Sequence, residues 1–129
     1  MSIERPASSD RQDTLELQVR SLRADRFLVR VLGDLDLHTA SRLADAVQPL
    51  LRSSRHSVLV DLSGVTFLDS TGLTCLIAAY RTTRDTGAGL VLIAPSQRVR
   101  RMLTLTGTDQ VLRSYPTVHA VPDQLPDHF

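Results

Sequence analysis

The chain lacks or is short of several residue types, and each shortage excludes a class of protein. Trp is absent and aromatic residues make up only 4% of 129 residues, so the stacking platforms of single-strand nucleic-acid binders are not expected. All 15 basic residues are arginine, yet the net charge is only +1, which argues against direct nucleic-acid binding. Cys75 is the single cysteine, so an internal disulfide is impossible.

Other absences concern location and chemistry. No apolar run approaches the roughly 18–20 residues of a membrane span, and residues 1–6 contain no apolar signal-peptide core. Together with the lone cysteine, this predicts a cytoplasmic protein without membrane insertion. The four histidines lack metal-ligand spacing, and no G-x-x-x-x-G-K-[ST] loop is present. We therefore predict no metal site, no cofactor and no enzymatic activity.

The length is that of one domain. The first twelve residues are polar and predict a flexible N-terminal tail over residues 1–12. Pro116, Pro122 and Pro126 punctuate the other end, where a C-terminal tail is expected over residues 122–129. A single domain is therefore predicted over residues 13–121.

Hydrophobic periodicity predicts the strands. Alternating apolar and polar residues indicate half-buried strands over residues 14–20 and 27–32, which a short turn would join as an antiparallel pair. Continuous apolar runs over 57–62 and 90–94 are typical of strands buried on both faces. A last, edge strand is expected over 111–115.

Apolar residues at helical spacing predict three helices, which follow Thr39, Asp69 and Pro95. Thr39 is a plausible N-cap, and residues 63–68 are expected to be a loop that returns two large apolar groups to the core. The element order is β-β-α-β-α-β-α-β. It predicts an α/β fold with one mixed, mostly parallel sheet of about five strands and three to four helices.

The segment Asp69-Ser70-Thr71-Gly72 carries the clearest functional signal. It places two hydroxyls and a carboxylate at a helix N-terminus, where unpaired N–H groups and the helix dipole favour a phosphate. Ser70 is the predicted phosphorylation site and Thr71 the runner-up. The alternative is that Ser70 is only a first-turn residue behind an Asp69 cap. Gly72 either lets a partner backbone approach or stays small for internal packing.

Two segments in this order resemble the STAS domain of bacterial anti-sigma factor antagonists. Residues 33–40 read GDLDLHTA, similar to the family's G-[ED]-[LI]-D before a helix. Residues 62–73 read LSGVTFLDSTGL, similar to its D-S-[ST]-G-L. The resemblance extends from about residue 15 to residue 115. Three prolines after Tyr115 depart from the longer C-terminal helix that family members often have.

The resemblance implies a partner-switching mechanism in transcription regulation. The unphosphorylated antagonist would bind an anti-sigma factor with serine-kinase activity and free the sigma factor. That kinase would phosphorylate Ser70 and end the interaction, and a serine phosphatase would reverse the modification. Asp36 and Asp69 match family acidic residues that flank the serine. The implied partner-binding residues are Asp36, Asp69, Ser70, Thr71 and Gly72.

Two other functions fit the same sequence. The chain is alternatively a non-switching STAS scaffold subunit of a signalling or transport complex. A less favoured alternative is a small-molecule or nucleotide-binding domain with its pocket near Asp36 and Asp69, where the strands of α/β sheets end. Arg98, Arg100 and Arg101 form a basic patch, interpreted as a solvated helix face first and as a contact for an acidic partner second.

Overall fold

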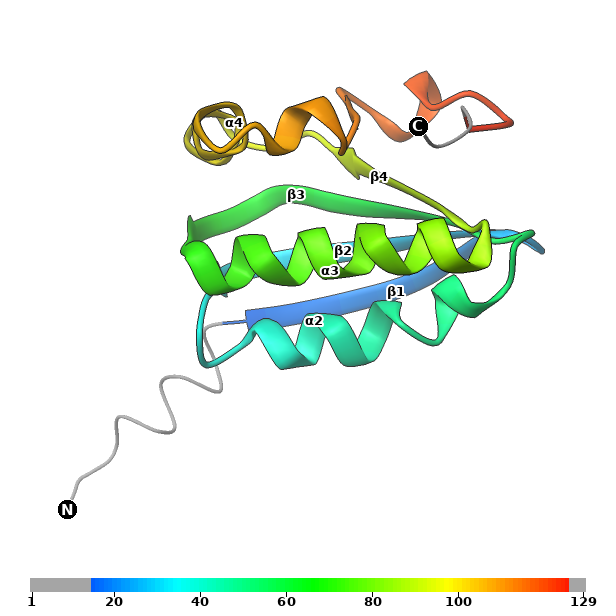
Figure 1. The fold of residues 1–129 in the computed structure, drawn as a ribbon, viewed down its shortest axis with the longest axis horizontal. Helices are drawn as coiled ribbons and strands as arrows, with labels where there is room; N and C mark the ends of the chain where they lie inside the picture. The colour runs from blue at the N-terminus through cyan, green and yellow to red at the C-terminus, as the bar shows by residue number, and fades with distance from the viewer. Residues whose placement is uncertain (1–14, 126–129) are drawn as a thin grey trace, which may run out of the picture.

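The structure is a computed structural model that describes residues 15–125 (Figure 1), and the tail predicted over residues 1–12 lies outside this range. The strands are β1 (Leu15–Arg23), β2 (Arg26–Leu35), β3 (Ser57–Leu68), β4 (Gly89–Ile93) and β5 (Ser114–Tyr115). The α-helices are α2 (Ala40–Val47), α3 (Ser70–Thr86) and α4 (Gln97–Leu105). Short 3-10 helices are η1 (Leu50–Arg52), η2 (Thr108–Gln110) and η3 (Val118–Ala120).

The strands form one mixed sheet in the order β1-β2-β3-β4-β5. β1 pairs with β2 in the antiparallel sense, and the other neighbours are parallel. This arrangement confirms the predicted α/β fold class. Because the carboxyl ends of β2, β3 and β4 lie at one edge of the sheet, the segments that follow these strands also meet there.

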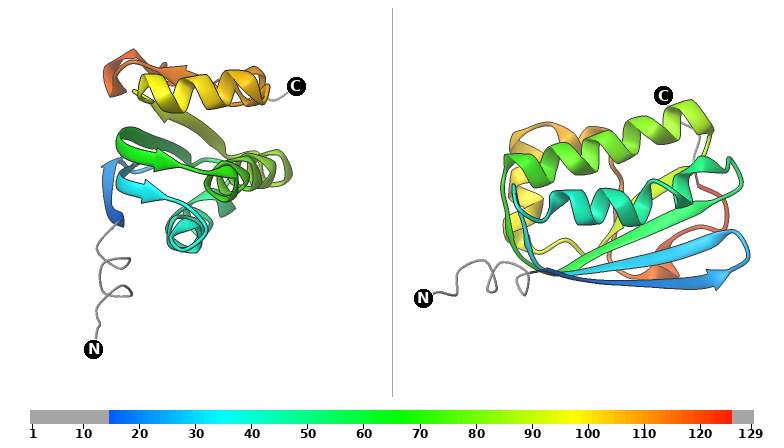
Figure 2. Two further views of the ribbon diagram at one scale, coloured as in Figure 1. Left: turned by 90° about the vertical axis from the view of Figure 1, so that its left-hand side faces the viewer. Right: turned by 90° about the horizontal axis from the view of Figure 1, so that it is seen from below.

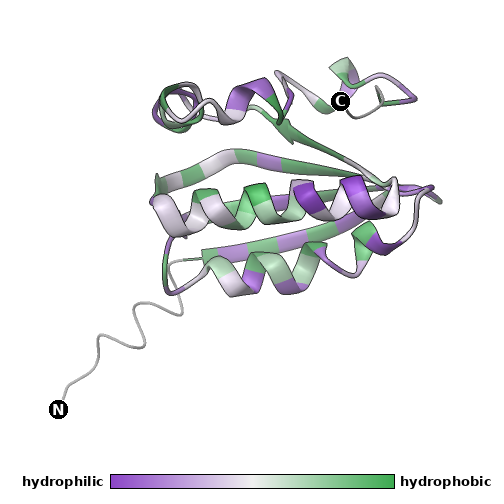
Figure 3. Ribbon diagram, in the orientation of Figure 1, coloured by the Kyte–Doolittle hydropathy of each residue, from purple (hydrophilic) through white to green (hydrophobic). Residues whose placement is uncertain are grey.

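The larger hydrophobic core lies between the sheet and the helices (Figure 2). β3 supplies Val58, Val60 and Leu62 to this side, because alternate side chains of a strand point to the same face. Leu43 of α2, Leu76 of α3 and other helical residues pack onto them. Hydrophobic residues predominate in β3 and β4, whereas α3 mixes both kinds, as expected for a buried strand and a half-exposed helix (Figure 3).

A smaller core lies on the other face of the sheet. It contains Leu59 of β3, Val91 of β4 and Val121, and Leu125 packs against it. The chain after β5 thus covers this part of the sheet. Residues 122–125, which the sequence assigns to a tail, contact the fold here, whereas residues 126–129 lie outside the described range. The boundaries of the predicted domain over 13–121 stay a prediction.

The segment 63–68 is not the expected loop, because β3 continues through it to Leu68. The extension pairs with the end of β2, with Gly33 beside Val65 and Leu35 beside Leu68. Two register irregularities let β2 and β3 stay paired beyond the end of β4. Two apolar side chains of this segment, Val65 and Leu68, enter the core, whereas Phe67 points outward and is 45% exposed.

The last predicted strand is also shorter than expected. β5 contains only Ser114 and Tyr115, because the amides of Val111 and Leu112 both donate to the carbonyl of Thr108 in a helical turn. Leu112 is nevertheless buried. The apolar side chain of Leu112 therefore indicated a buried position but not a β-strand.

Candidate functional site

The candidate site lies at the carboxyl edge of the parallel strands, where the β2–α2 loop and the start of α3 meet. In Figure 1 this is the end of the molecule at which α3 begins. Asp36 lies in the β2–α2 loop, and Asp69 lies between β3 and α3. Ser70, Thr71 and Gly72 form the first turn of α3.

Asp69 joins these two segments. One carboxylate oxygen, Oδ1, accepts a hydrogen bond from the Gly72 amide at 2.9 Å, which is the predicted N-cap interaction. The other, Oδ2, accepts from the Leu37 amide at 3.2 Å. The Asp69 amide also donates to the Leu35 carbonyl at 3.3 Å. A single side chain thus caps α3 and holds the β2–α2 loop beside the helix.

The β2–α2 loop is ordered by its own short-range hydrogen bonds. Asp36 Oδ1 accepts from the His38 amide at 2.9 Å. Thr39 occupies the predicted N-cap position but makes no capping bond to α2. Its buried hydroxyl instead accepts from the Asp36 amide at 2.9 Å and donates to the Asp34 carbonyl at 2.7 Å. The loop before the helix therefore competes successfully for this hydroxyl.

The two candidate phosphoacceptors differ in access. Ser70 is exposed as the first residue of α3, and its carbonyl accepts from the Thr74 hydroxyl at 2.8 Å. Thr71 is half-buried. A kinase active site needs an accessible hydroxyl, so this difference in exposure favours Ser70 over Thr71 as the acceptor.

Gly72 is buried against the end of β2. A Cβ placed on it would lie 2.4 Å from the Leu35 carbonyl oxygen and 2.8 Å from Leu68 Cδ1. Both distances are too short for real contacts, so internal packing accounts for a glycine at this position. Direct contact between Gly72 and a partner stays a prediction.

Two exposed apolar side chains flank the site, and sequence reasoning did not assign them to it. Leu37 is 68% exposed, and its amide is bound by Asp69. Phe67 is 45% exposed and lies three residues before Ser70 in the chain. Large apolar groups that are exposed beside a polar site are typical of protein contact surfaces. One signal in the sequence was available, since Leu37 lies in a short polar loop. Phe67 gave none, because strand alternation would place it on the same face as Val65, and an irregularity in the β2–β3 register separates the two.

Cys75 lies one turn into α3 and packs at the edge of the larger core. Its thiol donates to the Ala40 carbonyl, with 3.3 Å between sulfur and oxygen. Burial raises the pKa of the Cys75 thiol. The thiol is therefore a packed side chain that stays protonated at neutral pH.

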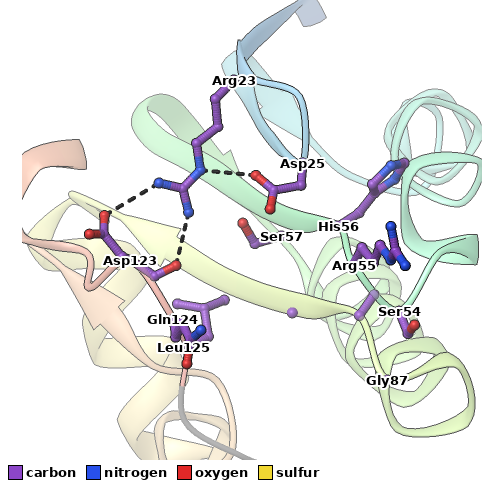
Figure 4. A pocket seen from close by; sticks show the side chains of 12 residues that line it. Arg23, Asp25, Ser54, Arg55, His56, Ser57, Gly87, Asp123, Gln124 and Leu125 are labelled. Atoms are coloured by element: carbon purple, nitrogen blue, oxygen red, sulfur yellow. Dashed lines mark hydrogen bonds and ion pairs between the residues drawn. The ribbon is translucent and has the colours of Figure 1, made fainter.

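A cleft of about 360 Å3 lies at the opposite, amino end of the strands, between the β1–β2 turn, the starts of β3 and β4, and residues 123–125 (Figure 4). Arg23 spans its mouth and pairs with Asp25 at 2.9 Å and with Asp123 at 3.3 Å. Hydrogen bonding to Asp25 raises the pKa of Arg23. Arg23, Asp25 and Asp123 are therefore already paired with each other.

Beside this cleft, Arg26 is buried, with 6% of its surface exposed. Its guanidinium donates to the Pro122 carbonyl at 2.7 Å, to the Asp123 carbonyl at 3.0 Å and to the Ser57 hydroxyl at 3.0 Å. Burial lowers the pKa of Arg26. This side chain ties the C-terminal segment to the sheet, a role that the sequence did not reveal.

Residues 15–125 contain neither a metal-binding cluster nor a membrane-spanning helix. No group of three or more His, Cys, Asp or Glu side chains in this range is arranged to hold a metal ion. No helix in the same range has the length and apolar character that crossing a membrane requires.

Comparisons with known proteins agree with this geometry. The family model of the STAS domain matches residues 18–121. An anti-sigma-B factor antagonist of Staphylococcus epidermidis is 27% identical over 99 residues, which cover 76% of this chain and 92% of the relative. A crystal structure of an anti-sigma factor antagonist from Mycobacterium paratuberculosis is 34% identical, with a TM-score of 0.67 over 83% of this chain and 90% of that one. The unphosphorylated form of the antagonist SpoIIAA shares the fold, with a TM-score of 0.67 at 16% identity over 81% of this chain and 92% of that one.

Proposed function

This chain belongs to the STAS domain family, as an anti-sigma factor antagonist, and from that premise we propose a switch controlled by phosphorylation of Ser70. Members of this group are regulators and not enzymes. In the proposed cycle the unphosphorylated chain binds a cognate anti-sigma factor in the bacterial cytoplasm and releases the sigma factor. The anti-sigma factor, acting as a serine kinase, phosphorylates Ser70, and the phosphorylated chain no longer binds it. A serine phosphatase restores the binding form.

The observation that carries the proposal is the exposed hydroxyl of Ser70 beside the Asp69 cap. Asp69 is held by the Gly72 and Leu37 amides, so the acceptor is presented on a defined first helical turn. Exposure gives a kinase access to the residue, and the exposed Leu37 and Phe67 belong to the segments that lead into the site and offer apolar contact. In this proposal Asp36, Asp69, Ser70 and Thr71 contribute polar contacts to the partner.

Phosphorylation would alter the contact surface more than the fold. A phosphate adds about −1.5 to −2 charges at pH 7. At the N-terminus of α3 the helix dipole tolerates this charge, so the domain remains folded. A partner surface that accepts a neutral hydroxyl would instead have to bury a dianion next to Asp69. Each 1.4 kcal/mol of that cost reduces the affinity about tenfold.

The test combines phosphate mapping with binding. Purified anti-sigma factors of the source organism are incubated with the chain and ATP, and mass spectrometry locates the phosphate. We expect it on Ser70. Ser70→Ala should bind the anti-sigma factor like the native chain and remain unphosphorylated, whereas Ser70→Glu should bind at least about tenfold more weakly in calorimetry.

Thr71→Ala is the matched control, because it removes the neighbouring hydroxyl and should still be phosphorylated. Phosphate on Thr71, or equal binding by Ser70→Glu and the native chain, would contradict the proposal. A chain that binds its partner but is never modified would instead be the non-switching scaffold. A binding isotherm in calorimetry with ATP alone, without an anti-sigma factor, would indicate the nucleotide-binding alternative.

A further inference from the structure

The outer face of α4 exposes two arginines, and at its far end the Thr104 hydroxyl donates to the Asp109 carboxylate at 3.1 Å. Gln97, Arg100, Arg101, Thr104 and Leu105 follow helical spacing and line a shallow groove of about 470 Å3. Val99 and Leu103 are buried on the opposite side of the helix. The helix is therefore anchored to the core by one face and presents the other to solvent.

The charge of α4 is of one sign. Arg98, Arg100 and Arg101 are all exposed, and residues 97–105 contain no acidic side chain. Within residues 15–125 none of these three arginines forms an ion pair. They also lie in the first turns of the helix, where the dipole disfavours positive charge. Their placement therefore does not serve the stability of α4.

The apolar end of this face adds a second feature. Leu105 is 79% exposed, and Val111, just beyond η2, is 46% exposed. Arginine and large apolar side chains are the groups that contribute most to protein contacts. A row of arginines that ends on an exposed leucine is thus better matched to a protein surface than to water.

This face lies at the same end of the molecule as Ser70. α3 follows β3 and α4 follows β4, and these strands are parallel, so both helices begin at the carboxyl edge of the sheet. Figure 1 places α4 above the end at which α3 begins, and the left view of Figure 2 looks onto both. A protein bound at Ser70 would therefore have α4 within the reach of its surface.

We propose that the outer face of α4 is a second contact surface for the anti-sigma factor, which meets it with an acidic patch. The inference rests on the proposed function and extends it by naming the chemistry of the partner. Positive charge beside the switch would speed association and add a salt-dependent contribution to affinity. Because phosphate appears at Ser70 and not on α4, this contact would persist in part after phosphorylation.

Charge reversal tests the proposal. The variant Arg100→Glu/Arg101→Glu should bind the anti-sigma factor that phosphorylates Ser70 about tenfold more weakly at low ionic strength, and the difference should shrink as salt is added. The control Arg52→Glu/Arg55→Glu makes the same change of net charge in exposed residues near the other end of the sheet. It should change the affinity less than about twofold. Arg100→Lys/Arg101→Lys keeps the charge and should bind almost normally.

The outcomes separate the two proposals. Equal loss in the reversal variant and its control would show a general charge effect and overturn the α4 contact. The α4 contact is also overturned if thermal unfolding shows that the reversal variant is folded and this variant binds like the native chain while Ser70→Glu does not. If Ser70→Glu also binds normally, or no anti-sigma factor of the organism binds the native chain, the proposed function itself fails.

Discussion

The two ends of the parallel strands use the same kinds of side chain in different ways. At the amino end, Arg23 and Arg26 bind the carboxylate and carbonyl groups of residues 122–123, so the charged and polar groups satisfy each other. At the carboxyl end, Asp69 binds two backbone amides and leaves the Ser70 hydroxyl exposed. The comparison indicates that the first end holds the fold together and that the second end is available to a partner.

The buried Arg26 at the amino end shows what such a structural role costs. Burying a guanidinium without a carboxylate beside it is unfavourable unless its N–H groups are hydrogen-bonded. Arg26 meets this condition with three oxygen acceptors from two distant segments of the chain. Removing it would delete a buried side chain and the three hydrogen bonds that tie the C-terminal segment to the sheet, which is where a large loss of stability arises.

The largest expected effect is therefore at the amino end. Arg26→Ala should lower the free energy of unfolding by about 3 kcal/mol, because a buried side chain and its charged hydrogen bonds to two distant segments are lost. Chemical denaturation measures the loss. Arg23→Ala is the matched control, and it should lose less because its ion pairs are solvent-exposed. Equal losses, or a weakened partner affinity in folded Arg26→Ala, would break the proposed division between the two ends.

The next effect is at the carboxyl end. Gly72→Ala should destabilise the chain by about 2 kcal/mol, although alanine is normally the better helix residue, because the new Cβ would collide with the Leu35 carbonyl and Leu68. Thermal unfolding distinguishes this from the gain expected for an unconstrained helix. Ser70→Ala, two positions earlier and exposed, should leave stability within about 0.5 kcal/mol. A stabilised Gly72→Ala would show that the glycine is not required by packing.

The smallest of the three effects joins structure to function. Asp69→Ala should cost about 1 kcal/mol of stability through loss of the α3 cap. It should also accelerate hydrogen exchange at the Leu37 amide, since that amide loses its acceptor. Asp85→Ala makes the same change near the far end of α3, where a carboxylate opposes the helix dipole, and should cost nothing. Unchanged exchange at Leu37 would remove the link between the loop and the helix.

Some of the candidate site was predictable because its interactions are local. Asp69 caps an amide three residues away. Gly87 ends α3 in the left-handed conformation with φ of 83°, which glycine adopts at no steric cost. The buried strands followed from uninterrupted apolar runs in the same way. Neighbouring residues decide such features, so spacing along the chain contains the necessary information.

The rest depends on pairings that spacing does not specify. The Asp69 contact with Leu37 spans 32 residues, and the Arg26 contact with Pro122 spans 96. Phe67 points outward only because β3 remains paired with β2 beyond its predicted end. The sequence by itself determined the order of elements, the buried strands and the position of a serine at a helix start. Only the tertiary structure decided which glycine is packed, which arginine is buried and which apolar groups flank Ser70, because each depends on strand register and on segments far apart in the chain.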